Sequence, residues 1–473
     1  MKKFPTSAGI IHFVGIGGIG MSGIADILVN LGYKVCGSDL KENAMTTRLA
    51  RKGVNIIIGH KKENVHDASV IVVSSAISKD NPEILEARRL KIPMIKRAEM
   101  LAELMKMKSS ISVAGTHGKT TTTSLIAAIL DQANIDPTVI NGGVINAYNS
   151  NARLGTGDWI VVEADESDGS FTKLMSTIAV VTNIDLDHVD KFKDFSELRS
   201  LFMQFIENIP FYGTAILCVD HSEVAKIANG DIDRKVITYG LSPEADVSCE
   251  NIIFSSNGSE FDIVFSEKIM ERYGLRDKIW KNFSLSMFGK HNIQNALAAV
   301  SSALELKISE ENMRIALGSF MGVKRRFTRV ADVNGVVIID DYAHHPVEIE
   351  AVLKAARTSC SGKIFAVMQP HRHTRLTNFL DDFAKSLELS DHAFVTPIYS
   401  AGEKNNGVDH FSLLKKINEN GVVSADFVLD IHALKEKLSG MMSAEDLVIF
   451  LGAGDITQWA YNFATLLEQS ENK

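Results

Sequence analysis

A phosphate-binding loop at residues 115–120 constrains the fold of this chain more than any other feature. The loop reads Gly115-Thr-His-Gly-Lys-Thr120, follows a short apolar strand at 111–114, and precedes four threonines and an apolar helix predicted over 124–130. A strand, a loop and a helix in this order direct backbone N–H groups and the helix dipole toward an anion. The pattern therefore predicts an α/β domain that binds nucleotide phosphates at the end of a strand.

Two side chains of this loop suit a nucleoside triphosphate. Lys119 can reach β- and γ-phosphate oxygens and is expected to face solvent, and the hydroxyl of Thr120 is placed to ligate a bridging Mg²⁺. Val113 stands where the longer form of the loop has glycine, so this is a shorter G-x-x-G-K-T loop. The ATP-binding residues predicted here are Gly115, Thr116, His117, Gly118, Lys119, Thr120 and Thr121.

Length and composition allow about three domains, at roughly 150 residues per domain. The chain has 473 residues, of which 45% are hydrophobic and 23% charged, and a formal net charge of −8, so it lacks the basic excess of nucleic-acid-binding proteins. No apolar run approaches the roughly 20 residues that span a bilayer, and no signal-peptide core follows Met1. We expect a cytoplasmic protein without nucleic-acid partners or membrane insertion, and the sequence leaves monomer and dimer open.

The amino-terminal region carries a dinucleotide-type fingerprint. An apolar strand at 10–14 leads into Gly15-Ile-Gly-Gly-Ile-Gly20, and helical spacing at 21–31 is followed by a strand that ends at Asp39. Such a turn holds a pyrophosphate at a helix N-terminus with the acid near a ribose, so the residues alone favour NAD and an oxidoreductase. Ser74 and Ser75 follow a strand predicted at 70–73 and are either phosphate contacts or a helix cap.

Two acidic clusters follow later strands of the loop domain. Residues 163–168 follow a strand predicted at 159–162, and residues 182–188 follow one predicted at 178–181. Ligands of open α/β sheets lie beyond the carboxyl ends of strands, so both clusters are expected in the crevice of Lys119. Each cluster alone is also compatible with a solvated loop. Together they favour Mg²⁺, which binds carboxylates and phosphates.

The carboxy-terminal region alternates strands and helices and is expected to form a small parallel sheet. Its strands are predicted at 336–339, 364–368, 393–396 and 447–451, and helices at 347–356 and 376–389. Polar residues follow two of its strands, at 340–346 and 369–375, and their arginines favour binding of an anion or carboxylate over a metal. Ahead of this region, residues 288–295 are expected to cap a helix at 296–306. Asn292 and Asn295 are then either capping residues or amides that bind a purine. Residues 322–327 are predicted to form an interdomain linker whose arginine reaches toward phosphate.

Several motifs together resemble those of the Mur ligases, the ATP-dependent amide-forming enzymes of peptidoglycan precursor assembly. They are G-T-H-G-K-T-T-T-T at 115–123, E-A-D-E-S-D at 163–168, D-H-V-D at 187–190, G-K-H-N-I-Q-N at 289–295 and D-D-Y-A-H-H-P at 340–346. The resemblance covers essentially the full length. It implies an α/β protein of three domains: a Rossmann-like UDP-sugar-binding domain at 1–108, a central P-loop-type mononucleotide-binding ATPase domain at 109–323, and a Rossmann-like amino-acid-binding domain at 324–473.

Two further motifs resemble one branch of the family. H-F-V-G-I-G-G-I-G-M-S-G at 12–23 and Q-P-H-R-H-T-R at 369–375 look most like the branch that joins L-alanine to UDP-N-acetylmuramate. This resemblance implies that the lactyl carboxylate is activated by ATP as an acyl phosphate and then attacked by the amine. The branch that adds a tripeptide during recycling is the alternative, and the nicotinamide-dependent oxidoreductase is the alternative from a different class.

The resemblance also implies a role for individual residues. It makes the glycine-rich turn a site for uridine diphosphate, with Gly17, Gly18, Gly20, Asp39, Ser74 and Ser75 as candidates. It implies that Thr120 and Glu163 ligate one Mg²⁺ and that His188 ligates a second. It adds Asn292, Asn295, Arg326 and Asp340 to the ATP site and assigns L-alanine to His344, Arg372 and Arg375. The catalytic candidates are Lys119, His188, Arg326 and His344.

Overall fold

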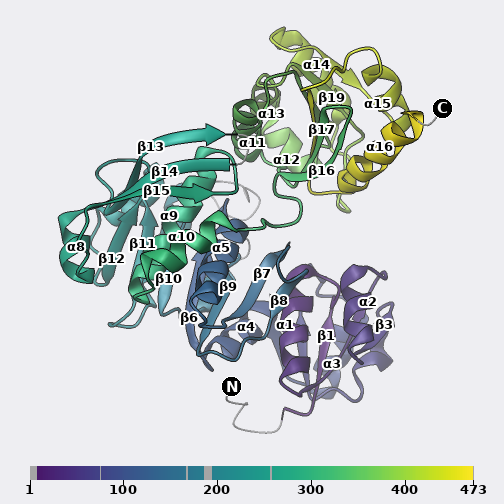
Figure 1. The fold of residues 1–473 in the computed structure, drawn as a ribbon. Helices are drawn as coiled ribbons and strands as arrows, with labels where there is room; N and C mark the ends of the chain where they lie inside the picture. The colour runs from purple at the N-terminus through teal and green to yellow at the C-terminus, as the bar shows by residue number, and fades with distance from the viewer. Residues whose placement is uncertain (1–7, 75, 167–168, 186–193, 256–257, 472–473) are drawn as a thin grey trace. The chain divides into compact units, whose positions relative to one another are not determined.

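The described part of the chain contains three β-sheets with helices between their strands (Figure 1). This computed structural model describes residues 8–74, 76–166, 169–185, 194–255 and 258–471. The architecture is the three-domain α/β arrangement expected from the sequence. The chain divides into two compact units, which are Met1–Asn251, Phe261–Ser284 and Gln294–Met321 in the first, and Ile252–Glu260, Leu285–Ile293 and Gly322–Lys473 in the second.

The first sheet is parallel and has the strand order β3-β2-β1-β4-β5. Its elements are β1 (Ile10–Val14), α1 (Ile19–Asn30), β2 (Lys34–Asp39), α2 (Ala44–Arg51), β3 (Asn55–Ile58), η1 (Lys62–Val65), β4 (Val70–Val73), α3 (Pro82–Leu90) and β5 (Met94–Lys96). The strand order reverses beside β1, and crevices for ligands form at the carboxyl ends of strands at such a point. The glycine-rich turn follows β1 there.

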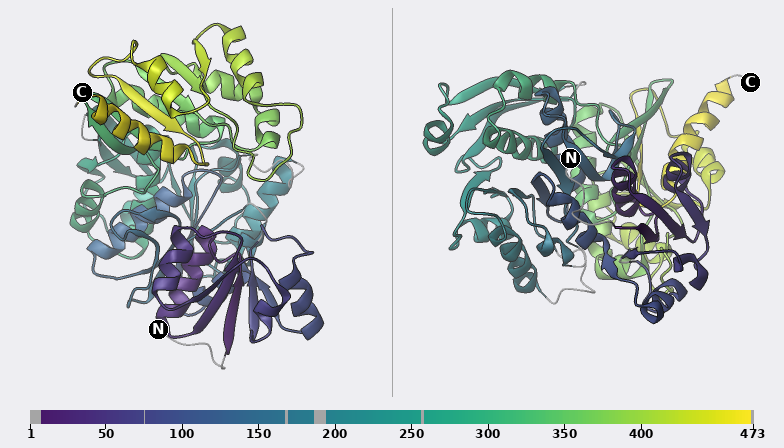
Figure 2. Two further views of the ribbon diagram at one scale, coloured as in Figure 1. Left: turned by 90° about the vertical axis from the view of Figure 1, so that its right-hand side faces the viewer. Right: turned by 90° about the horizontal axis from the view of Figure 1, so that it is seen from below.

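Helices cover both faces of this first sheet (Figure 2). Phe13 and Ile24 belong to a cluster that includes α1 and α4 (Arg97–Met105), whereas Val14 and Ala87 belong to one that includes η1 and α3. The first of these clusters continues to Phe202 in the next domain. Burial of apolar side chains on both faces explains why β1, β3 and β4 are mostly apolar in sequence.

The second sheet has the order β15-β14-β13-β12-β11-β10-β6-β9-β7-β8. Its strands are β6 (Ser109–Ala114), β7 (Thr138–Ile145), β8 (Ser150–Arg153), β9 (Trp159–Glu163), β10 (Ile178–Val181), β11 (Thr214–Cys218), β12 (Lys235–Tyr239), β13 (Val247–Ser255), β14 (Gly258–Phe265) and β15 (Ile279–Leu285). The helical segments are α5 (Lys119–Gln132), η2 (Ser170–Lys173), α6 (Phe195–Glu207), α7 (Ser222–Ala228), α8 (Glu267–Tyr273), α9 (Lys290–Glu305) and α10 (Glu310–Gly318). β6 lies between β9 and β10 and is parallel to both, so the phosphate loop and the segments after β9 and β10 share one edge of the sheet.

The third sheet has the order β16-β17-β21-β18-β19-β20. Its strands are β16 (Thr328–Val333), β17 (Val336–Asp341), β18 (Ile364–Met368), β19 (His392–Val395), β20 (Ala425–Phe427) and β21 (Leu447–Leu451). The helices are α11 (Pro346–Ser359), α12 (His373–Asn378), α13 (Leu380–Leu387), α14 (His410–Asn420), α15 (Ile431–Leu438) and α16 (Ile456–Glu471).

The expectation of a purely parallel third sheet was wrong at one strand. β16 is antiparallel to β17, and the two strands are joined by Asn334 and Gly335, which have φ angles of 53° and 79°. An Asn-Gly pair with positive φ forms the tight hairpin turn that matches strand twist. The remaining neighbours in this sheet are parallel.

Three predicted helix positions also need correction. α5 begins at Lys119 rather than at 124, because Gly118 adopts a φ of 80° and starts the helix directly after the loop. α9 begins at Lys290, so Asn292 and Asn295 lie inside its first turns rather than ahead of it. The helix expected near 376–389 is interrupted at Phe379, whose φ of −127° is not helical, into α12 and α13.

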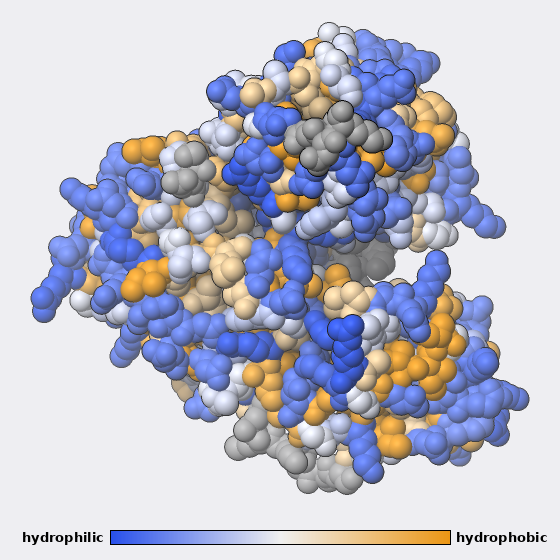
Figure 3. All heavy atoms as spheres, turned by 45° about the vertical axis from the view of Figure 1, so that its right-hand side comes forward, coloured by the Kyte–Doolittle hydropathy of each residue, from blue (hydrophilic) through white to orange (hydrophobic). Residues whose placement is uncertain are grey.

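Among the described residues, no helix is both long and apolar enough to cross a membrane. Figure 3 shows one face of the molecule, where hydrophilic residues predominate and apolar residues form smaller groups. This surface agrees with the ordinary globular composition of the chain.

Candidate active site

Lys119 is held inside the phosphate loop rather than facing solvent as the sequence suggested. Its side chain is only 14% exposed, and Nζ lies 2.9 Å from Glu166 Oε2. Nζ also donates to the carbonyl oxygens of Thr116, at 2.9 Å, and Gly115. The reason is the loop's curvature, which turns these carbonyls toward the ammonium while Glu166 reaches it from the segment after β9.

Burial and neighbouring charges have opposite effects on the pKa values of Lys119 and Glu166. Burial alone would lower the pKa of Lys119, but the carboxylates of Glu166, Glu163 and Asp165 outweigh it, and the pKa is raised. Burial raises the pKa of Glu166 to about 7. Glu166 belongs to the acidic stretch that the sequence marked, but only Glu163 was singled out there, because spacing alone does not show which acid faces the loop.

Thr120 and Glu163, the two candidate ligands of one Mg²⁺, are brought together. Thr120 Oγ1 donates to Glu163 Oε2 at 2.9 Å, and the N–H of Gly142 donates to the same oxygen at 2.7 Å. A hydroxyl and a carboxylate are hard oxygen ligands that fit Mg²⁺. His188, the candidate for a second ion, and the whole 187–190 motif lie outside the described residues.

The segment after β10 holds the loop from its other side. The N–H of Asp185 donates to Thr116 Oγ1 at 2.8 Å, and the N–H of His117 donates to Asn183 Oδ1 at 2.7 Å. Gly115 is required here, because a Cβ at this position would lie 2.1 Å from Thr182 Oγ1 and its φ is +133°. These contacts hold the loop in its curved form.

The two candidate asparagines of α9 belong to different compact units. Asn295 lies at the loop: its Oδ1 accepts from Thr122 Oγ1 at 3.0 Å and would be 2.7 Å from a Cβ on Gly118. Asn292 belongs to the second compact unit, where its Nδ2 donates to Phe288 O at 2.8 Å.

The glycine-rich turn after β1 is closed by Asp39. The N–H of Gly17 donates to Asp39 Oδ2 at 2.8 Å, so this amide is already engaged. Gly18 starts α1 without a side-chain cap, and the first N–H groups of a helix have no partner within it. These amides, which include that of Gly20, are the ones suited to an anion.

Of the two serines after β4, only Ser74 lies within the described residues. The Oγ of Ser74 accepts from the N–H of Ala76 at 3.4 Å, which makes it part of a local turn. Ser75 lies outside the described residues.

In the third domain, a cluster of rings lies at the carboxyl ends of β17 and β18. The ring of His344 meets that of His371 edge-on with centroids 5.5 Å apart, and His371 stacks on Tyr399 at 5.6 Å. Nη1 of Arg375 lies 3.4 Å from His371 Nδ1. Burial and neighbouring positive charges lower the pKa of His371 to about 3, so this ring is neutral beside the arginine.

Arg372 is held by an acid that the sequence did not indicate. Its Nε donates to Glu403 Oε1 at 2.6 Å, and Glu403 Oε2 accepts from the N–H of Thr374 at 3.0 Å. Arg372 has a φ of +69°, a strained conformation that often marks functional sites. Glu403 lies in a stretch without a motif, so only its position in space reveals it.

Three other candidates of the third domain have partners within their own unit. Nη1 of Arg326 lies 3.9 Å from Glu348 Oε1, and Glu348 Oε2 lies 3.2 Å from His344 Nδ1. Asp340 is buried and accepts from the hydroxyl of Thr457. All three belong to the second unit and the phosphate loop to the first. The roles of Arg326 and Asp340 at ATP and of His344 at L-alanine therefore stay predictions.

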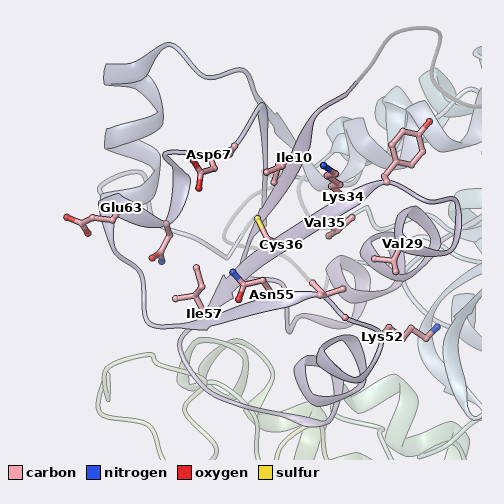
Figure 4. A pocket seen from close by; sticks show the side chains of 15 residues that line it. Ile10, Val29, Lys34, Val35, Cys36, Lys52, Asn55, Ile57, Glu63 and Asp67 are labelled. Carbon is pink, nitrogen blue, oxygen red and sulfur yellow. The ribbon is translucent and has the colours of Figure 1, made fainter.

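A separate hollow of about 580 Å³ lies in the first domain (Figure 4). Its lining includes Ile10 of β1, Lys34 and Cys36 of β2, and Asn55 of β3. These residues stand at or near the amino ends of parallel strands, whereas the glycine-rich turn follows a carboxyl end. The hollow is therefore not part of the predicted sugar-nucleotide site.

Models of one protein family match three successive parts of this chain. The Mur ligase catalytic domain matches residues 10–109, the Mur ligase middle domain 113–303, and the Mur ligase glutamate ligase domain 325–454. The chain therefore belongs to the Mur ligase family, and the resemblance inferred from its motifs is confirmed.

Individual relatives narrow the comparison. A UDP-N-acetylmuramate–L-alanine ligase of Maricaulis maris is 52% identical over 465 residues, which cover 98% of each chain. The crystal structure of a UDP-N-acetylmuramate–alanine ligase from Thermotoga maritima has a TM-score of 0.82 and 28% identity, and the match covers 98% of this chain and 100% of that one. A murein peptide ligase of Psychrobacter arcticus shares the fold with a TM-score of 0.71 and 24% identity, over 97% of this chain and 98% of that one.

Proposed function

We propose that this chain joins L-alanine to the lactyl carboxylate of UDP-N-acetylmuramate, with conversion of ATP to ADP and phosphate, in peptidoglycan precursor synthesis. The observation that carries the proposal is the 52% identity to a ligase of that name over 98% of both chains. A solved ligase whose name includes the tripeptide is less similar, at 25% identity over 67% of this chain. An oxidoreductase would leave the phosphate loop and its acids without a role. We expect the enzyme to act in the cytoplasm, where ATP is available.

The reaction would proceed in two steps. A lactyl carboxylate oxygen attacks the γ-phosphorus and the bond to ADP breaks, which gives an acyl phosphate. The amine of L-alanine then attacks the acyl carbon, phosphate leaves, and the amine loses a proton. Lys119 would stabilise charge on the transferring phosphoryl group, with Arg326 as a further candidate.

The Lys119–Glu166 pair supports this role. Lys119 must exchange its protein carboxylate for phosphate oxygens when ATP binds. Because the pKa of Glu166 is about 7, this carboxyl takes up a proton readily near neutral pH. A protonated Glu166 holds the ammonium less strongly, which eases the exchange.

We infer a Mg²⁺ site at Thr120 and Glu163, with His188 proposed for a second ion. The hydroxyl–carboxylate distance of 2.9 Å and the hard oxygen donors support the first assignment. When bound, Mg²⁺ would supply positive charge against the triphosphate. Glu163→Gln should lower activity, and the defect should lessen as Mg²⁺ is raised. A defect that does not respond to Mg²⁺ would count against a ligand role for Glu163.

We propose the ring cluster of the third domain as the L-alanine site. An α-carboxylate pairs best with the planar fork of an arginine, and Arg375 and Arg372 offer two. Nδ1 of His344 lies 2.9 Å from Tyr342 O. A proton donated along that contact leaves Nε2 as the basic nitrogen, suited to accept a proton from the amine.

Phosphate release from ATP tests the proposed function. Purified protein is given UDP-N-acetylmuramate with L-alanine, glycine, L-serine or the tripeptide in parallel. We expect release to require the sugar nucleotide and to be fastest with L-alanine. Release with ATP alone, or only with the tripeptide, would contradict the proposal, as would an absorbance change with a nicotinamide cofactor.

A further inference from the structure

A positively charged side chain that the sequence did not single out lies against the glycine-rich turn. Arg97 is the first residue of α4, the helix that leads from the first sheet to the second. A Cβ placed on Gly20 would lie 2.9 Å from Arg97 Nη1 and 3.2 Å from its Cδ. The guanidinium therefore packs directly on the first turn of α1, whose N–H groups are suited to an anion.

Arg97 is fixed in this position by the acidic stretch of the second domain. Its Nη2 donates to Asp165 Oδ2 at 2.8 Å, and its side chain is 17% exposed. Within the described ranges, the hydrogen bonds of this side chain are confined to Asp165, so Nη1 keeps its donors for another partner. A guanidinium has five donors in a planar fork, and one carboxylate does not use them all.

A pyrophosphate bound at this turn would need a positive charge close to it. The carboxylate of Asp39 already binds the N–H of Gly17, so a negative charge stands where a pyrophosphate is expected. Among the side-chain atoms nearest to a Cβ built at Gly15, Gly17, Gly18 or Gly20, those of Arg97 carry the positive charge. A doubly charged pyrophosphate beside Asp39 would be poorly compensated by backbone amides alone.

We propose that Arg97 binds the pyrophosphate of the sugar nucleotide through Nη1. This rests on the proposed function and adds a residue to the predicted sugar-nucleotide site. Because Nη2 is held by Asp165, the bound nucleotide would also be linked, through one side chain, to the acidic stretch that surrounds Lys119. An arginine suits this position because it can contact both anions at once, whereas a lysine is a single point charge.

Direct binding without turnover tests the proposal. Calorimetry of the full chain would measure UDP-N-acetylmuramate and UDP-N-acetylglucosamine, which share the pyrophosphate but differ in the lactyl carboxylate. Arg97→Gln should weaken both ligands by a similar factor of about 10 to 100, the size expected for one lost charge-assisted contact. Arg97→Lys should fall between wild type and Arg97→Gln, which gives a second variant if the first is unstable.

Lys173→Gln is the matched control. It removes the ion pair of 2.7 Å between Lys173 and Glu99, which joins η2 to the same α4 but does not reach the glycine-rich turn. We expect a loss of affinity below about threefold, as for exposed ion pairs. If Lys173→Gln weakens binding as much as Arg97→Gln, the role of Arg97 is structural and the proposal fails.

Other outcomes are equally decisive. Unchanged affinity in Arg97→Gln would overturn the proposal, and a loss for UDP-N-acetylmuramate alone would move the contact to the lactyl carboxylate and overturn the pyrophosphate assignment. A wild-type protein that binds neither ligand would instead overturn the proposed function itself.

Discussion

At the scale of single residues, the pairing of Lys119 with Glu166 determines what a substitution of Lys119 does to the protein. The ammonium is enclosed by two loop carbonyls and a buried carboxyl, so a substitution there changes a packed site. Glu166 has a pKa of about 7 and can become neutral when its partner is lost. When Lys119 is removed, a neutral Glu166 should destabilise the fold less than an unpaired buried carboxylate would.

Lys119→Ala is expected to abolish most activity while the protein remains folded. Loss of one group that stabilises the transferring phosphoryl should reduce turnover by about 10²-fold or more. Phosphate release and thermal unfolding would be measured on the same preparation, with Glu166→Gln as the control that keeps the lysine. Turnover above about a tenth of wild type would place the ATP site elsewhere.

Arg375→Lys should raise the KM for L-alanine while those for ATP and UDP-N-acetylmuramate stay nearly constant. The substitution keeps the charge but loses the planar fork that matches a carboxylate, and we expect about a tenfold effect. Arg357→Lys is a control for the same chemical change, because Arg357 pairs with Asp391 at the surface. A weaker interaction with ATP and normal L-alanine kinetics would assign Arg375 to the nucleotide site.

Asp341 should make stability depend on pH. This carboxyl accepts from the N–H groups of Phe327 and Ala343, each at 2.7 Å, yet burial raises its pKa to about 6. A raised folded-state pKa gives stability that is present below the unfolded pKa near 3.8 and is lost as pH rises through about 6. Relative to Asp341→Asn, the wild type should lose about 2 kcal/mol between pH 4 and pH 7. Urea unfolding across that range would show it, and a flat or opposite difference would disprove it.

At the scale of elements, the strands that are buried on both faces were predicted most accurately. Predicted strands at 70–73, 178–181, 364–368 and 447–451 match β4, β10, β18 and β21, because each is a short apolar run buried in a parallel sheet. β7 and β8 were missed, since β8 (Ser150–Arg153) is short and polar. Its position beside α1 depends on contacts distant in sequence.

Asn151 of β8 should stabilise the start of α1, the helix that follows the glycine-rich turn. It is fully buried, its Nδ2 donates to Ile19 O at 2.7 Å, and its Oδ1 accepts from Arg48 Nη2 at 2.8 Å. Asn151→Ala should cost roughly 1–3 kcal/mol and weaken sugar-nucleotide binding. Urea unfolding and calorimetry would measure both effects. Asn229→Ala, at an exposed position after α7, should change neither, and equal effects of the two variants would contradict the assignment.

At the scale of the whole molecule, the proposed chemistry requires both compact units. The lactyl carboxylate, the γ-phosphate and the amine must come within bonding distance, and water must be kept from the acyl phosphate. The phosphate loop belongs to one unit and the L-alanine candidates to the other. We therefore predict that residues of both units act on the substrates during turnover.

Substrates should accordingly compact the protein. Small-angle scattering should show a smaller radius of gyration when an ATP analogue and UDP-N-acetylmuramate are both present than with either alone. ATP hydrolysis without L-alanine should be slow, because the acyl phosphate is then protected but not consumed. An unchanged radius would contradict closure.

The sequence by itself determined the class of fold, the phosphate loop and the family, because these depend on residues close together in the chain. Apolar periodicity indicates strands and helices, and a glycine-rich loop between a strand and a helix favours phosphate binding. Only the tertiary structure decided that Glu166 pairs with Lys119, that Glu403 holds Arg372, and that Arg97 lies on Gly20. Each partner is distant in sequence, and which of several like-charged side chains lies within hydrogen-bond distance is set by how strands and helices pack.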